Sequence, residues 1–65
     1  MPPSTFAQMR ARAYELADTG RFDGWLEIAS MLESEGFDKA SLRLRSDPIL
    51  LRMIDARCEQ AKDRS

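Results

Sequence analysis

The sequence predicts an all-α fold, a small bundle of three longer helices and one short helix. Apolar residues recur at the i, i+3, i+4, i+7 spacing of a helix face, and no segment alternates like a half-buried strand. Glycine or proline stands where each helix would end or begin. At 65 residues the chain is expected to form a single domain, residues 1–65. The predicted helices cover residues 6–19, 23–35, 39–45 and 48–62, with frayed ends at 1–4 and 63–65.

The first predicted helix begins after Thr5, which has Gln8 at the spacing of a capping box. Its apolar stripe consists of Phe6, Met9, Ala13, Leu16 and Ala17, with Tyr14 at the edge. Gly20 follows, and glycine adopts the left-handed conformation that ends a helix at low cost. These features predict one amphipathic helix with a sharp end.

The second predicted helix lies between two glycine breaks and contains the single tryptophan. One face carries Trp25, Ile28, Ala29 and Leu32. Asp23 is the expected N-cap. Glu33 and Glu35 lie near the C-terminal end, where the helix dipole disfavours carboxylates. We therefore expect these two acids to have a basic neighbour from elsewhere in the chain or from another subunit.

The last two predicted helices follow Gly36. Asp38 is the expected N-cap of the third, with Phe37 and Leu42 spaced as a hydrophobic staple. Asp47 and Pro48 predict the start of the fourth. The stripe of the fourth helix is Leu50, Leu51, Ile54, Cys58 and Ala61, widened by Met53. The residues expected at the centre of the core are Leu16, Trp25, Ile28, Leu32, Phe37, Leu51 and Ile54.

The composition argues against catalysis. The chain has no histidine, which is the commonest general base and metal ligand, and its single cysteine cannot form an internal disulfide. It has no glycine-rich phosphate loop and no Cys/His metal spacing. Cys58 lies on an apolar stripe, so a buried structural thiol is favoured over one activated by Arg57. We expect no enzyme, no catalytic residue, no cofactor and no metal site.

Charge is unevenly distributed in a chain of net charge −1. Residues 21–38 carry one arginine against five acidic residues, whereas residues 39–65 carry seven basic against four acidic residues. The acidic face, with Glu27, Glu33 and Glu35, predicts a basic partner, which includes the chain's own C-terminal half. No apolar run has the length of a membrane span or signal core, so a cytoplasmic protein without a membrane partner is expected.

Small size favours self-association. A core of this size rarely supplies more than about 3–5 kcal/mol, and oligomerisation is one way to add to it. We expect a homodimer whose interface is formed by the fourth helix, with Leu50, Met53, Arg57 and Cys58. The leading hypothesis is a non-catalytic helical interaction module that self-associates or binds another protein through a helix face.

The segment WLEIASMLESEGFDKASLRLR resembles a helix-turn-helix, in which a second, short helix enters the DNA major groove. The resemblance covers about a third of the chain. It implies an alternative function, a DNA-binding regulator that uses the basic segment 39–45. The implied base and phosphate contacts are Lys39, Ser41, Arg43 and Arg45.

The whole chain also resembles small all-helical bacterial proteins with no assigned activity. The shared pattern is a GRF-x-x-W break followed by a Leu-x-x-x-Gly-Phe ending. Here it is formed by Gly20, Arg21, Phe22, Trp25, Leu32, Gly36 and Phe37. This resemblance implies a helical fold and brings no mechanism.

Overall fold

The computed structural model describes residues 5–63. They form four helices, α1 (Thr5–Asp18), α2 (Trp25–Ser34), α3 (Ala40–Arg45) and α4 (Pro48–Asp63), and contain no strand. The all-α bundle predicted from the sequence is confirmed, and each helix boundary lies within two residues of its expected position. Of the ends expected to fray, 1–4, 64 and 65 lie outside the described residues, while Asp63 is the last residue of α4.

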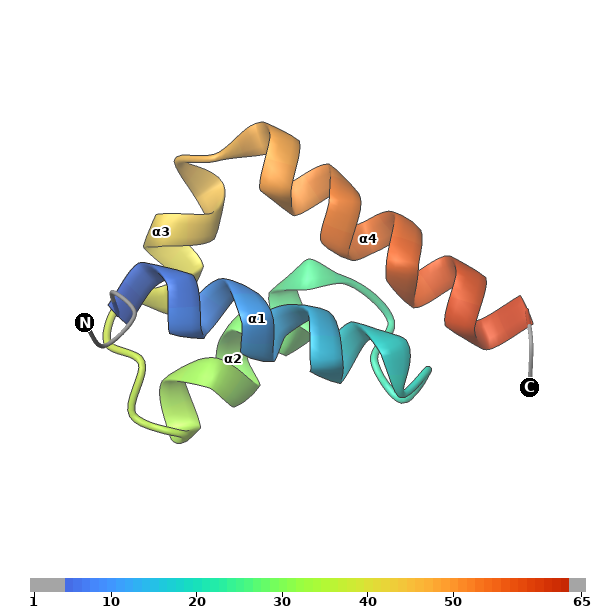
Figure 1. Cartoon of the computed structure of the whole chain (residues 1–65), viewed down its shortest axis with the longest axis horizontal. Helices are drawn as coiled ribbons and strands as arrows, with labels where there is room; N and C mark the ends of the chain where they lie inside the picture. Colours follow the sequence, from blue (N-terminus) through green and yellow to red (C-terminus); the bar gives the residue numbers. More distant parts are fainter. Residues whose placement is uncertain (1–4, 64–65) are drawn as a thin grey trace.

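The helices form a small bundle in which α1 contacts both α2 and α4 (Figure 1). The α1–α4 pair makes the most extensive helix contact, followed by α2–α3. Short α3 connects α2 to α4 at one end of the molecule. None of the described helices combines the length and hydropathy that a bilayer span requires.

The core is apolar, and no polar or charged side chain of residues 5–63 is fully buried. Its buried members are Met9, Ala13, Leu16, Ala17, Ile28, Ala29, Leu32, Ala40, Leu44, Leu50, Ile54, Cys58 and Ala61. Five of these are alanines, whose small side chains let the helices approach closely. Leu16, Ile28, Leu32 and Ile54 were predicted at the centre and are buried.

Three residues predicted at the centre of the core lie at its margin instead. Trp25, Phe37 and Leu51 are only half-buried. Trp25 opens α2 and Phe37 follows its end, so both cover the core from the helix ends rather than filling it. Met9 and Leu44 are among the largest fully buried side chains in their place.

The glycine stops lie where they were predicted. Gly20 has φ +72° and its N–H donates to the Ala17 carbonyl at 3.2 Å. Gly36 has φ +101°, and the Phe37 N–H donates to the Leu32 carbonyl at 3.0 Å. The second pattern is the Schellman end of a helix, in which glycine supplies the left-handed residue.

The start of α4 has the predicted cap, but the start of α2 does not. The Leu50 N–H donates to Asp47 Oδ1 at 3.1 Å. In α2 the N-cap is Gly24, and the Trp25 N–H donates to Oδ1 of Asp55 on α4 at 2.8 Å. The Asp23 N-cap prediction was therefore wrong: a carboxylate from another helix takes the position, and the Asp23 side chain pairs with Lys62.

The start of α3 is also capped from another helix. Its N-cap is Lys39 with φ +59°, not Asp38 as predicted. Oε2 of Glu33 accepts hydrogen bonds from the Ser41 N–H at 3.1 Å and the Ser41 hydroxyl at 2.8 Å. Leu42, expected to staple against Phe37, is 57% exposed.

Glu35 has the basic neighbour that its position predicted. Arg12 of α1 donates to both carboxylate oxygens of Glu35, through Nε at 2.9 Å and a terminal nitrogen at 2.8 Å. The pKa of Glu35 is lowered chiefly by this hydrogen bonding. Glu33 forms no ion pair within residues 5–63, and its carboxylate caps α3 instead.

Candidate functional site

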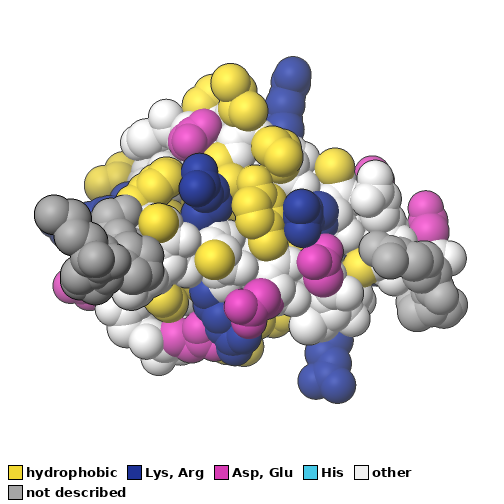
Figure 2. Space-filling view, viewed as in Figure 1, with side chains coloured by type: hydrophobic (Ala, Val, Ile, Leu, Met, Phe, Trp, Pro, Cys, Tyr) yellow, Lys and Arg dark blue, Asp and Glu magenta, His cyan; other side chains and the backbone are white. Residues whose placement is uncertain are grey.

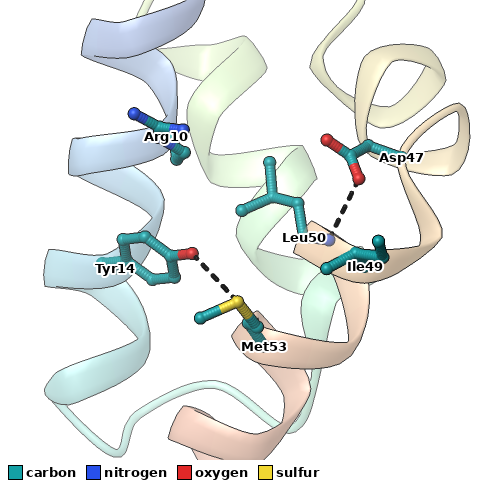
Figure 3. Close-up of a pocket in the computed structure, with 6 residues that line it drawn as sticks. All are labelled: Arg10, Tyr14, Asp47, Ile49, Leu50 and Met53. Atoms are coloured by element: carbon teal, nitrogen blue, oxygen red, sulfur yellow. Dashed lines mark hydrogen bonds between the residues drawn. The ribbon is translucent and has the colours of Figure 1, made fainter.

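The most distinctive surface lies between α1 and α4. The large hydrophobic side chains that stay exposed are Leu26, Met31, Leu42, Ile49 and Met53. Ile49 and Met53 lie one turn apart on α4, and Ile49 is the most exposed of the five, at 72%. They border a hollow of about 250 Å³ (Figure 3), whose lining is Arg10, Tyr14, Asp47, Ile49, Leu50 and Met53.

Tyr14 lies at the centre of this surface. It lies at the edge of the α1 stripe, half-buried, with its hydroxyl directed towards α4. That hydroxyl donates to Met53 Sδ at 3.7 Å (Figure 3). The guanidinium carbon of Arg57 lies 4.2 Å from the ring centroid, a cation–π distance. Two residues of α4 therefore contact the Tyr14 side chain, Arg57 over the ring and Met53 at the hydroxyl.

Charged side chains border the apolar centre. Arg10 and Asp47 line the hollow, and Arg57 pairs with Asp18 at 3.3 Å. We call this surface the α1–α4 face. It comprises Arg10, Tyr14 and Asp18 of α1, Ile49, Met53 and Arg57 of α4, and Asp47 just before α4. Figure 2 shows hydrophobic side chains gathered over α1 and α4, with basic and acidic groups around them.

The four residues predicted as an oligomer interface divide between surface and core. Met53 and Arg57 lie on the α1–α4 face. Leu50 and Cys58 are 4% and 1% exposed, so they pack inside the chain itself, and Leu50 also lines the hollow. The apolar positions of the fourth helix include both surface-facing and core-facing residues. The sequence pattern does not show which of them face the core.

The interface predicted from the sequence did not include the α1 half of the face or Ile49 of α4. Ile49, Met53 and Arg57 follow the i, i+4, i+8 spacing of one helix face, which is a readable signal. Arg10, Tyr14 and Asp18 repeat the same spacing on α1. Their juxtaposition with α4 depends on which helices pair, and no local pattern carries that information.

Cys58 is buried, as predicted. Burial raises the pKa of its thiol, and the negative charge of Asp55 adds to the effect. A thiol held in its protonated form is a weak nucleophile. Among residues 5–63, no three thiol or carboxylate side chains gather closely enough to hold a metal ion.

The residues implied as DNA contacts lie on or beside α3. Lys39, Arg43 and Arg45 are exposed, and none of them forms an ion pair within residues 5–63. Ser41 is half-buried, and both its N–H and its hydroxyl are bonded to Glu33. Lys39, Arg43 and Arg45 therefore remain accessible, whereas Ser41 is bonded to the Glu33 carboxylate.

Comparison with protein-family models, curated proteins and solved structures found no match to this chain.

Proposed function

We propose that this chain is a non-catalytic helical interaction module that binds a helix, from a second copy or from another protein, on the α1–α4 face. The observation that carries the proposal is the exposure of Ile49 at 72%, with Met53 and Tyr14 beside it around a hollow of about 250 Å³. Covering an isoleucine of this exposure contributes about 1–2 kcal/mol to association.

The composition of the face supports this function. Protein interfaces have an apolar centre and a polar rim, and they are enriched in tyrosine, methionine and arginine. The centre here is Ile49, Met53 and Tyr14, and the rim is formed by arginine and aspartate side chains. A partner helix with apolar residues at i and i+4 would match the one-turn separation of Ile49 and Met53.

The test compares capture by the wild-type chain and by a face variant, Ile49→Glu/Met53→Glu. Each is immobilised and exposed to isotope-labelled extract of the cells that make the protein, supplemented with labelled copies of the chain. Leu26→Glu is the matched control, because Leu26 is also exposed, at 60%, but lies on α2. Protein bound by wild type and control, and lost in the face variant, would support the proposal. Equal capture by all three would refute it.

A second candidate is DNA binding through α3, favoured by Lys39, Arg43 and Arg45, which are exposed and form no ion pair within residues 5–63. Phosphate attraction is strongest at low salt, so binding to random duplex DNA at low ionic strength is the decisive assay. The double variant Arg43→Ala/Arg45→Ala should weaken any such binding uniformly across sequences. No association of the wild-type chain at low salt would eliminate this candidate.

A further inference from the structure

We infer that the α1–α4 face is covered by a second copy of this chain, related by a two-fold axis that crosses both helices at Tyr14 and Met53. The inference rests on the proposed function and specifies its partner. In this arrangement each α1 lies antiparallel to the α1 of the other copy, and each α4 antiparallel to the other α4.

The order of charges along α1 carries the inference. Arg10, Tyr14 and Asp18 are spaced four residues apart and share one helix face. Four helical residues span about 6 Å, so Arg10 and Asp18 lie at equal distances on either side of Tyr14. A two-fold axis at Tyr14 therefore places Arg10 of each copy opposite Asp18 of the other.

Both charged groups are available for this pairing. Arg10 is exposed and forms no ion pair within residues 5–63. The Asp18 side chain remains 50% exposed while it contacts Arg57. Its carboxylate can therefore accept Arg10 of a second copy without losing Arg57.

The same axis fits α4. Ile49, Met53 and Arg57 repeat the four-residue spacing, and the Tyr14–Met53 contact at 3.7 Å places both midpoints side by side. An axis through Met53 sets Ile49 of one copy over Arg57 of the other. The aliphatic stem of an arginine commonly covers apolar surface while its charged end stays in water. Ile49 of one copy is thus covered by the aliphatic stem of Arg57 from the other.

A second copy fits better than a strongly charged partner. The α1–α4 face carries two arginines, Arg10 and Arg57, and two aspartates, Asp18 and Asp47, so its charge is balanced. A nucleic acid or a highly acidic peptide would meet the aspartates with repulsion. A second copy, by contrast, can set the positive groups of one face against the negative groups of the other. The chain is also short and its core is rich in alanine, so a second copy adds burial that one copy lacks.

The test is a charge-reversal mixing experiment. In Arg10→Asp, two aspartates face each other at both ends of the interface, and in Asp18→Arg, two arginines do. Each variant alone should dimerise about tenfold more weakly than wild type, because two exposed pairs become repulsive. Mixed at equal amounts, the two variants form a heterodimer in which both pairs are attractive. Sedimentation equilibrium of the wild type, the single variants and the mixture gives each dissociation constant.

We expect the wild-type chain to dimerise, each single variant to have a dissociation constant about tenfold higher, and the mixture to recover most of the wild-type affinity. Ile49→Glu should weaken the dimer at least tenfold, whereas Leu26→Glu should leave it unchanged. Circular dichroism checks that every variant is folded. A wild-type monomer at several hundred micromolar, a mixture no tighter than its components, or a dimer indifferent to Ile49→Glu would each overturn the inference. Capture of a different protein by the same face would then leave the proposed function standing.

Discussion

Asp55 offers the sharpest test of how this fold is held together. Its Oδ1 accepts the Trp25 N–H at 2.8 Å and so caps α2 from a position thirty residues along the chain. Gly24 makes room for it, since a Cβ there would lie 3.2 Å from the same oxygen. We predict that Asp55→Ala destabilises the chain more than Asp23→Ala, although Asp23 is the residue whose sequence position favours capping.

The magnitude follows from the contacts. Losing a helix N-cap costs about 1 kcal/mol, and a half-buried N–H left without a partner adds to this, so Asp55→Ala should cost about 1–2 kcal/mol. In a domain of this size each kcal/mol lowers the melting temperature by roughly 4–8 °C. Asp55→Asn keeps an oxygen acceptor but loses the charge at the helix N-terminus, which costs about 0.5 kcal/mol. Asp23→Ala removes only an exposed pair with Lys62 and should have the smallest effect.

Urea titrations followed by circular dichroism and Trp25 fluorescence provide the unfolding free energies. Amide hydrogen exchange at Trp25 supplies a local measurement, since this N–H should exchange faster in Asp55→Ala than in wild type. Equal destabilisation by Asp23→Ala and Asp55→Ala would contradict capping of α2 by Asp55. An unchanged exchange rate of the Trp25 N–H in Asp55→Ala would contradict it as well.

Three further predictions concern other parts of the bundle. Gly20→Ala should cost about 1–2 kcal/mol of unfolding free energy in urea titrations, because φ is +72° and the added Cβ would lie 3.2 Å from the Ala61 carbonyl oxygen; an unchanged midpoint would contradict this. The pKa values of Glu33 and Glu35 lie below their ordinary 4.5, so the unfolded chain binds protons first. The stability that these two carboxylates contribute is therefore complete above about pH 4.5 and is lost as the pH falls through their lower pKa values in the folded chain. Between pH 5 and 3 the melting temperature should fall less steeply in Glu33→Gln/Glu35→Gln than in the wild type. An equally steep fall in both would argue against this contribution. Cys58 should react with a thiol reagent at least about a hundredfold more slowly in the native than in the unfolded chain, and rapid labelling of folded protein would show that the thiol is accessible.

Local signals accounted for most of the fold. Single residues mark several helix ends: Gly20 and Gly36 through their left-handed backbone, and Asp47 through its capping carboxylate. The structure has these ends as predicted. Helical periodicity identified all four buried residues of α1, Met9, Ala13, Leu16 and Ala17. These features depend on neighbours within one turn, which the sequence displays directly.

The features that the sequence did not reveal depend on contacts between helices. Asp55 and Glu33 cap α2 and α3 from thirty and eight residues away. Of the candidate site, only the surface positions Met53 and Arg57 were predicted, because the periodicity of α4 shows an apolar arc without showing which part of it turns inward. Tyr14 became part of the site through the pairing of α1 with α4.

The acidic segment around α2 shows how such contacts change the interpretation of a surface. Its excess of carboxylates predicted a docking site for a basic partner. In the structure Glu27 accepts the Asp23 N–H at 2.8 Å, Glu33 caps α3 through Ser41, and Glu35 binds Arg12. A basic partner would have to compete with hydrogen bonds that already fix the ends of α2 and α3 and join α2 to α1. Because these carboxylates are hydrogen-bonded to other residues of the same chain, the charged groups that remain available for recognition lie elsewhere. On the α1–α4 face the charges are balanced, and this balance is what the proposed contact with a second copy would use.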